Sequence, residues 1–198
     1  RMCLNAPKFG NDEDYVDRIV REWYEIAYEE YQKHPDNLGN PAMPEAFSVS
    51  GHNQVGIRTG ALPSGRLGRT PLTDASVSAM PGTDKKGPTA LVRSAAQAVD
   101  TVKWGSNHLN MKFHPSALRT VEGRIKLLAL IKTYMDLGGS MVQFNCVSNE
   151  TLKEAQLHPE RYRNLVVRVA GFSAYFIHLD KTLQDEIIRR TELRWEGG

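Results

Sequence analysis

A stretch near the C-terminal end constrains this chain more than any other part of the sequence. Residues 165–169 form an apolar run interrupted by a single arginine, and an aromatic-rich run follows directly after Gly171. This pattern predicts a buried strand that turns sharply at the glycine while its flanks stay in the core. Glycine is the usual residue where the backbone needs a positive φ or passes close to another segment. On these residues alone, an ordinary structural bend is the favoured interpretation of Gly171.

Composition and charge narrow the classes of protein to consider. The chain has 198 residues, enough for one ordinary domain with a substantial core. Its formal net charge is only +2 and its basic residues are interspersed with acidic ones, so we expect no nucleic-acid partner. No apolar run is long enough to cross a bilayer and no signal-peptide pattern is found, so we expect no membrane partner and a cytoplasmic location. Two cysteines are too few for a disulfide framework and lack the spacing of metal ligands.

The hydrophobic periodicity predicts alternating helices and strands. We expect helices over residues 15–33, 87–99, 121–136, 149–157 and 180–190, and strands over residues 46–57, 108–113, 141–147 and 165–169. This order is typical of an α/β protein with parallel strands covered on both faces. No internal repeat or linker divides the chain, and these strands are too few to close a barrel.

A turn-rich region separates the first predicted strand from the second predicted helix. Residues 60–87 contain several prolines and glycines but few large apolar side chains. Long ordered loops often carry function or form interfaces, but the spacing favours the simpler interpretation of a surface connection. Lys85 and Lys86 precede the helix that begins near Gly87, where an anion could bind, yet no glycine-rich phosphate motif supports such a site.

Conventional catalytic and metal-binding patterns are not found in the sequence. The six histidines are scattered, and none has an acidic residue at the spacing of a known catalytic or metal-binding motif. The sequence also has no nucleophile elbow and no His-Glu-x-x-His motif. In the strand predicted over residues 141–147, Gln143 and Asn145 share one face, and Cys146 lies on the apolar face, where we expect it to be buried. We therefore expect neither a metal site nor a cofactor-binding residue in this chain.

Several segments of the sequence resemble glycyl radical enzymes. Residues 168–174, Arg-Val-Ala-Gly-Phe-Ser-Ala, are similar to the Arg-Val-x-Gly-Tyr/Phe signature around the glycine that carries the radical in these enzymes. Phenylalanine at position 172, where tyrosine is usual, is a mild departure. The other segments similar to the C-terminal part of the family are residues 60–66, 71–74, 82–90, 109–113, 142–145 and 183–191. Among the branches, the sequence resembles the dehydratases, decarboxylases and arylalkylsuccinate synthases more than pyruvate formate-lyase.

The resemblance implies a fold, a radical site and a partner. The expected fold is α/β: the C-terminal part of a ten-stranded α/β barrel over residues 1–139, followed by a glycine radical domain over residues 140–198. Gly171 would store the radical, installed by an activase that uses S-adenosylmethionine and an iron–sulfur cluster to remove a hydrogen atom. The residues expected to form the radical loop or to be recognised by the activase are Arg168, Val169, Ala170, Phe172 and Ser173.

A radical on glycine has clear structural requirements. Without a side chain the centre can become planar, and the flanking amide nitrogen and carbonyl stabilise it. The radical must be kept from oxygen and water, so we expect it in an apolar interior. The residues that would supply this interior are Val167, Val169, Phe172 and Phe176, and Arg168 is a candidate anchor for the loop.

The sequence departs from the family at the second catalytic residue. Family members carry a cysteine in a Gly-Cys-x-x loop, and neither Cys3 nor Cys146 lies in such a motif. The resemblance therefore implies that this chain is the C-terminal portion of a lyase that forms a homo-oligomer. The catalytic cysteine and the groups that bind a small organic substrate would lie outside it. Three alternatives stay open: addition to fumarate as in arylalkylsuccinate synthases, a stand-alone radical-repair module, and a catalytically silent interaction domain.

Overall fold

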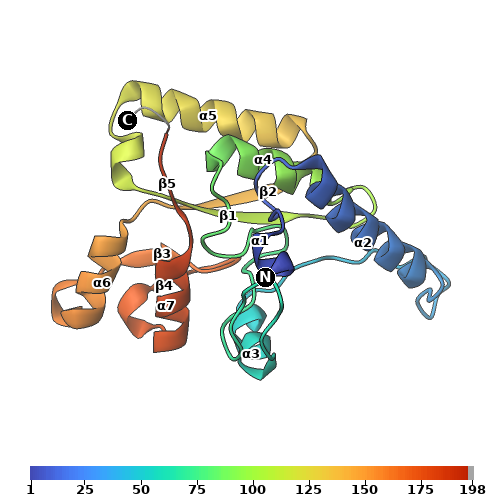
Figure 1. Cartoon of the computed structure of the whole chain (residues 1–198), viewed down its shortest axis with the longest axis horizontal. Coiled ribbons are helices and arrows are strands. Elements are labelled where there is room, and N and C mark those ends of the chain that lie inside the picture. Colours follow the sequence, from blue (N-terminus) through green and yellow to red (C-terminus); the bar gives the residue numbers. More distant parts are fainter. Residues whose placement is uncertain (196–198) are drawn as a thin grey trace.

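The computed structural model describes residues 1–195, so the last three residues of the predicted second domain lie outside the described part. Its elements are α1 (Met2–Asn5), α2 (Asp14–Gln32), α3 (Gly51–Arg58), α4 (Gly87–Ala98), β1 (His108–Phe113), α5 (Val121–Asp136), β2 (Met141–Asn145), α6 (Asn149–Leu157), β3 (Val166–Arg168), β4 (Ser173–Tyr175), α7 (Lys181–Arg189) and β5 (Glu192–Leu193). Helices α4 and α5 lie on one side of β1 and β2, whereas α6, α7 and the β3–β4 hairpin lie on the other (Figure 1).

The central sheet is parallel, as predicted. β1 pairs with β2 from His108 opposite Met141 to Lys112 opposite Asn145, and its C-terminal end pairs with β5. Beside the start of β1, the backbone amides of residues 76 and 77 both donate to the carbonyl oxygen of His108. Because β5 pairs only with the C-terminal end of β1, the start of β1 would have an exposed edge on that side. The turn-rich region partly covers this edge.

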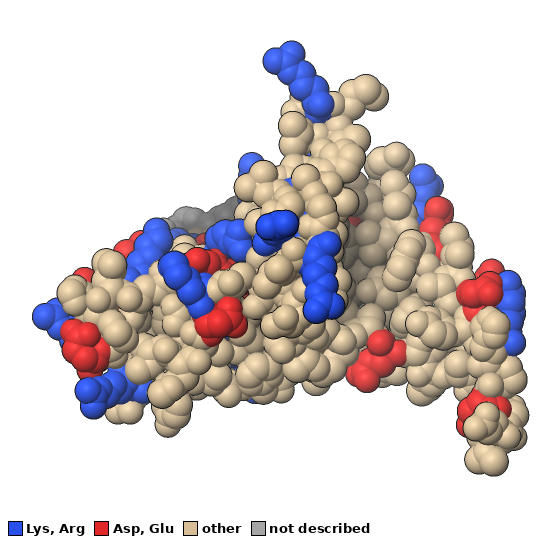
Figure 2. Space-filling model, turned by 90° about the horizontal axis from the view of Figure 1, so that it is seen from below, with Lys and Arg blue, Asp and Glu red and all other residues tan. Residues whose placement is uncertain are grey.

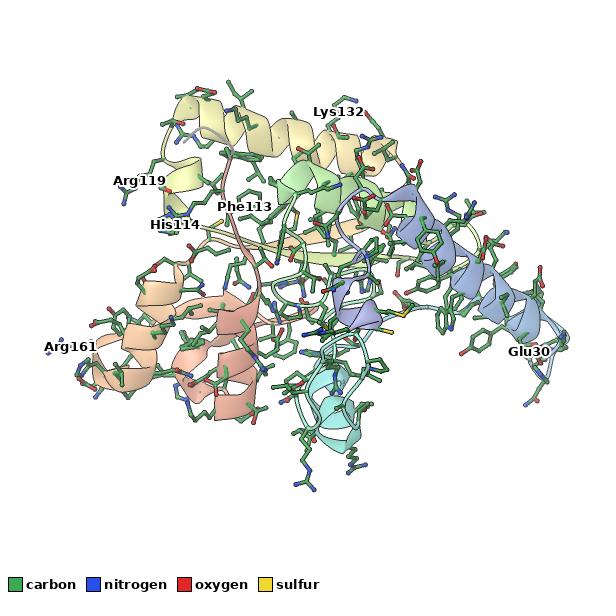
Figure 3. The ribbon with its side chains drawn as sticks, in the orientation of Figure 1. Glu30, Phe113, His114, Arg119, Lys132 and Arg161 are labelled. Carbon is green, nitrogen blue, oxygen red and sulfur yellow. The ribbon has the colours of Figure 1, made fainter. Side chains whose placement is uncertain are left out.

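One face of the central sheet packs against α2, α4 and α5. Alternate residues of β1 point to this face, because side chains alternate along a strand. The core formed there includes Leu91, Val92, Leu109, Met111, Phe113, Leu130 and Tyr134. Phe113 lies at the end of β1 near β5, and His114 follows it directly (Figure 3).

The opposite face of the sheet is polar, yet it is buried. It carries Asn110 and Lys112 of β1 together with Gln143 and Asn145 of β2. A second hydrophobic core lies beyond this face and joins α6, α7 and the hairpin. Its buried members are Val147, Leu152, Ala155, Val167, Val169, Phe176, Leu183 and Ile187. The hairpin that carries Gly171 is therefore attached to the sheet across a polar layer.

The predicted helices form close to their expected boundaries, and their first turns explain why. Thr120 accepts a hydrogen bond from the amide of Gly123 at the start of α5, and Ser148 accepts one from Thr151 at the start of α6. Asp180 accepts one from Leu183 at the start of α7. Each side chain satisfies an amide that the helix leaves without a backbone partner.

The strand predicted over residues 46–57 is wrong. Helix α3 occupies Gly51–Arg58, and the apolar residues Val55 and Ile57 are exposed on it. The buried residues of α3 are His52, Asn53 and Gly56. A Cβ atom at Gly56 would lie 2.5 Å from the carbonyl oxygen of Thr70, so a close backbone approach fixes this helix. The residues that pack are polar or small, and hydrophobic alternation therefore misassigned the segment.

The interpretation of residues 60–87 as a surface connection is wrong for part of the region. Asp74, Ala75 and residues 77–79 are buried. Arg66 is also buried and donates to the backbone carbonyls of Gly56, Gly60 and Thr70. Its planar, forked guanidinium can satisfy several carbonyls at once, which ties the loop to α3.

Basic and acidic side chains are interspersed over the face shown in Figure 2. Among residues 1–195, no helix combines the length and the apolar character needed to cross a bilayer.

Candidate functional site

Gly171 lies in the turn between β3 and β4. The two strands are antiparallel, and the amide of Val169 donates to the carbonyl oxygen of Phe172 at 2.9 Å. This bond closes a loop of two residues, Ala170 and Gly171. Gly171 has φ +81°, in the left-handed region that glycine adopts freely and other residues adopt only with strain.

The residues that lead into the turn are buried, and those that follow it are exposed. Val169 and Ala170 are buried, whereas Gly171, Phe172 and Ser173 are exposed on the surface of this chain. Phe172 is 37% exposed within this chain, and its place in an apolar interior stays a prediction. The other members of that expected interior, Val167, Val169 and Phe176, are buried in the second core.

Gln143 of β2 holds the amide of the glycine. Its Oε1 atom accepts a hydrogen bond from Gly171 N at 3.0 Å and another from Arg168 Nε at 2.6 Å. Arg168 Nη1 in turn donates to Ser173 Oγ at 3.3 Å. Arg168 therefore ties the two sides of the turn to each other and to the sheet.

Two asparagines hold the backbone that leads into the turn. Asn145 Oδ1 accepts from Arg168 N, and Asn145 Nδ2 donates to Arg168 O, both at 2.7 Å. Asn110 Nδ2 of β1 donates to Val169 O at 3.1 Å. We call Asn110, Gln143 and Asn145 the amide clamp. They share one face of the sheet because Asn110 and Gln143 are register partners and Asn145 lies two residues further along β2.

A buried cluster of charges lies next to the amide clamp. Arg190, directly after α7, pairs with both carboxylate oxygens of Glu186 at 2.8 and 2.9 Å and lies 3.3 Å from Asp74 Oδ2. It also donates to Arg168 O at 3.3 Å. Asp74 accepts a hydrogen bond from Asn110 Nδ2, so the clamp and the charge cluster form one network.

Burial and pairing act in opposite directions on the two carboxylates of this cluster. Burial is the largest influence on Asp74 and raises its pKa, although the nearby Arg190 opposes that change. Burial also disfavours the charged form of Glu186, but the charge and hydrogen bonds of Arg190, together with the nearby His52, whose Nε2 lies 3.6 Å from Glu186 Oε2, lower its pKa. The bidentate geometry gives Glu186 the larger share of the guanidinium, so the cluster contains a charged Glu186–Arg190 pair.

Lys112 makes a further polar connection between the sheet and α7. Its Nζ atom donates to the carbonyl oxygens of Ile187 and Ile188 at 3.1 and 2.9 Å and to Asn149 Oδ1 at 2.8 Å. Carbonyls near the end of a helix lack intrahelical partners, and a cation there is favourable. Burial lowers the pKa of Lys112 to about 8.

The contact at the Cα atom of Gly171 is apolar. A Cβ atom placed there would overlap Cζ of Phe47 and would lie 3.1 Å from its Cε2. The ring of Phe47 meets the ring of His108 edge-on, with centroids 4.2 Å apart. Both the positive φ and the lack of space therefore require glycine at this position.

This geometry suits chemistry at a backbone carbon. The amide of Gly171 is held by Gln143 and the carbonyl of Val169, one peptide earlier, by Asn110, and the nearest atoms on the side-chain side of the Gly171 Cα are carbons of Phe47. The neighbouring nitrogen and carbonyl can stabilise an unpaired electron on Cα when their peptide planes are fixed. Removal of a hydrogen atom fits this environment better than proton transfer, which needs a positioned acid or base.

A sequence model described as "Glycine radical" matches residues 73–177, which is more than half of the chain and includes the whole hairpin. The chain belongs to the glycine radical family. A second model, described as "Pyruvate formate lyase-like", matches residues 1–56.

Curated relatives of this glycine radical chain align over nearly its whole length. It is 47% identical over 193 residues to indoleacetate decarboxylase from Tractidigestivibacter scatoligenes. It is 44% identical over 190 residues to the 4-hydroxyphenylacetate decarboxylase glycyl radical subunit from Clostridium scatologenes. The alignments cover 97% and 96% of this chain but only 22% and 21% of the two relatives. The chain thus spans about a fifth of their length.

Solved structures of the glycyl radical type share this fold. The chain matches B12-independent glycerol dehydratase from Clostridium butyricum with a TM-score of 0.92 at 42% identity. It matches hydroxyproline dehydratase from Clostridioides difficile with a TM-score of 0.92 at 37% identity. Each match covers 98% of this chain and about a quarter of the other (25% and 24%). The predicted α/β fold of the glycyl radical enzyme type is therefore confirmed.

Sequence reasoning missed most of the residues that hold the Gly171 turn of this family member. The strand pattern placed Gln143 and Asn145 on one face without assigning them a partner. The available signal was that amide side chains recur at alternate positions of two neighbouring parallel strands. Cys146 was expected to be buried, but it is exposed, because in this part of β2 the buried face is the one with Gln143 and Asn145.

One group of potential metal ligands lies away from the glycine. Among the described residues, ligand atoms of His114, Glu150 and Glu192 lie within 4.8 Å of one another. His114 Nδ1 is already paired with Ser116 Oγ at 2.6 Å, and Glu192 pairs with Arg194 at 3.2 Å.

Proposed function

We propose that this chain is the radical-storing part of a glycyl radical lyase, with the radical at Gly171. The observation that carries the proposal is the position of this glycine in a family member. It lies in a two-residue turn at φ +81°, its amide is held by Gln143, and its Cα faces the ring of Phe47. The peptide plane on the N-terminal side of Cα is thus held before any hydrogen is removed.

The proposed reaction begins with removal of one hydrogen atom from the Cα of Gly171. A separate activase that uses S-adenosylmethionine and an iron–sulfur cluster supplies the hydrogen-abstracting species. The glycyl radical later takes a hydrogen atom from the thiol of a cysteine outside these 198 residues, which restores Gly171 and leaves a thiyl radical. The thiyl radical then takes a hydrogen atom from a small organic substrate and starts its elimination or decarboxylation.

The predicted loop residues divide into two groups in this proposal. Phe172 and Ser173 are exposed beside Gly171, so they are the residues of this loop that an activase can contact. Val169 and Ala170 are buried and act by fixing the turn, and Arg168 ties the turn to Gln143. We retain residues 1–139 and 140–198 as the proposed division into barrel part and radical domain, and a homo-oligomer as the proposed assembly.

Decarboxylation of an arylacetate is the substrate reaction we propose to test first. The two relatives reported above at 47% and 44% identity are named for indoleacetate and 4-hydroxyphenylacetate decarboxylation. Addition to fumarate has no such support. A stand-alone repair module or a silent interaction domain is disfavoured, because the similarity includes residues 1–56 and extends over 97% of the chain to an enzyme.

Electron paramagnetic resonance of the anaerobically activated enzyme that contains this sequence tests the proposal. We expect a doublet in the wild-type protein and none in Gly171→Ala. Because the substituted Cβ would meet Phe47, circular dichroism must first show that this variant is folded. A doublet that persists in folded Gly171→Ala would contradict the assignment. Release of CO2 from indoleacetate or 4-hydroxyphenylacetate then tests the substrate class separately.

A further inference from the structure

The segment before α3 places one aromatic ring directly on the reactive carbon of the proposed radical site. The three atoms nearest to the Cβ position of Gly171 are all carbons of the Phe47 ring, at Cζ, Cε2 and Cε1. The two ring carbons Cε2 and Cε1 lie 3.1 and 3.4 Å from that position. Phe47 therefore covers one side of the Gly171 Cα, the side that an L-amino-acid side chain would occupy.

The contacts of Phe47 are not those of an ordinary core residue. It belongs to neither of the two hydrophobic cores and is 39% exposed. Its ring packs edge-on against His108, a buried residue at the start of β1, with ring centroids 4.2 Å apart. Phe47 contributes to neither core, yet its ring lies against the Cα of Gly171, which points to a local role.

The backbone around Phe47 is held in position on both sides. On one side Ala46 packs against the first core, and Glu45 accepts a hydrogen bond from Ser106 Oγ. On the other side Val49 has φ +49°, which is rare for a β-branched residue, and the amide of Gly51 donates to Ser48 O at 2.6 Å. A costly conformation persists only where the surroundings impose it, so the ring is presented to Gly171 by a constrained turn.

We propose that Phe47 shields Gly171, slowing the addition of dioxygen to the radical stored there. This inference rests on the proposed function. Dioxygen destroys such a radical by forming one C–O bond to Cα, which leaves the unpaired electron on the terminal oxygen as a peroxyl radical. The ring occupies one of the two sides from which dioxygen can approach a planar Cα. Exclusion of competing reactants is an established way for a protein to protect a reactive intermediate.

Decay of the radical in the presence of oxygen tests this role. The complete enzyme and its Phe47→Ala variant are activated anaerobically and mixed with buffer of known oxygen content. The doublet is then followed by freeze-quench electron paramagnetic resonance and normalised to its initial amplitude. We expect the Phe47→Ala doublet to decay at least about twofold faster than the wild-type doublet, because a second side of Cα then opens to dioxygen. Phe47→Leu, which keeps apolar bulk, should decay at an intermediate rate.

A matched control separates shielding from a general loss of aromatic packing. Tyr175 of β4 is half exposed and contacts His178, so Tyr175→Ala removes a nearby aromatic ring that does not cover Gly171. Its doublet should decay at the wild-type rate, and acceleration equal to that of Phe47→Ala would overturn the proposal. So would a wild-type decay rate in Phe47→Ala.

Two further outcomes distinguish a failure of the shielding role from a failure of the proposed function. If Phe47→Ala accumulates no radical, the Phe47→Leu comparison decides, and a wild-type rate in that variant overturns the shield. If the wild-type enzyme itself gives no glycyl doublet after activation, the proposed function fails, not the shield alone. Faster decay in both Phe47 variants at normal initial amplitude supports the two together.

Discussion

At the scale of single residues, the site depends on side-chain amides bonded to backbone groups. Gln143 is central, because one oxygen accepts both the Gly171 amide and the Arg168 guanidinium. An amide side chain is suited to this position: it satisfies the backbone without bringing a titratable proton to the reactive carbon. The sequence pattern alone did not predict these hydrogen bonds, since Gln143 and Gly171 are 28 positions apart. Only the fold brings them together.

The first prediction concerns this shared oxygen. Gln143→Leu should lower the free energy of unfolding by about 1–3 kcal/mol, because it leaves the Gly171 amide and Arg168 Nε without their acceptor. It should also accelerate hydrogen exchange at the Gly171 amide. Urea titration and exchange measured by nuclear magnetic resonance or mass spectrometry check both effects. Gln143→Glu keeps an acceptor oxygen and is the control; equal exchange in the Leu and Glu variants would argue against the clamp.

At the scale of elements, α7 is joined to the sheet by charge rather than by a continuous apolar surface. The hydrophobic period correctly predicted α7 and β1, because their apolar residues face the two cores. It also located α5, although Ile125 and Leu128 are exposed and the helix packs through Leu130 and Tyr134. It failed for α3, where the buried residues are His52, Asn53 and Gly56. It also gave no partner for β3, since the short strand β4 that pairs with it follows within the same aromatic-rich run. The hydrophobic pattern of the sequence therefore predicts an element whose apolar residues are buried. It does not predict an element that is held by polar contacts.

The second prediction addresses the charge cluster at the end of α7. Arg190→Met should destabilise the protein by about 3–5 kcal/mol, because it leaves Glu186 and Asp74 as buried carboxylates without a cation. Thermal or urea unfolding measures the change. Arg189→Met at the neighbouring exposed position is the matched control and should cost far less. Similar losses in the two variants would contradict the structural role assigned to Arg190.

The third prediction uses the lowered pKa of Lys112. The folded protein releases this proton near pH 8, whereas the unfolded chain keeps it until its ordinary pKa of 10.5. Between these pH values the unfolded state binds more protons, so the Lys112 contribution to the free energy of unfolding increases with pH. Urea titrations from pH 7.5 to about 10 in the wild-type protein and Lys112→Met should show this increase only in the former. Lys132→Met, at an exposed lysine of α5, should retain it.

At the scale of the whole molecule, two hydrophobic cores lie on either side of a polar layer. The long axis of the molecule runs from Arg161, which follows α6, to Glu30, near the end of α2 (Figure 3). Between them, the polar face of β1 and β2 holds the glycine turn. The resemblance read from residues 168–174 predicted the fold, and its assignment of the radical to Gly171 stays a prediction. It could not predict the surroundings of that glycine, because Phe47, Asn110 and Gln143 come from separate parts of the chain.

The measurement that tests the central claim most directly is isotopic, because it leaves the fold unchanged. The enzyme is produced with glycine deuterated at Cα, activated anaerobically and compared with unlabelled enzyme by electron paramagnetic resonance. If the unpaired electron resides on Gly171, the remaining Cα hydrogen causes the doublet, and deuteration should collapse it to a narrow singlet. The folded Gly171→Ala protein should give neither signal. A splitting that is unaffected by glycine deuteration would contradict the account, because the radical would then lie on another residue.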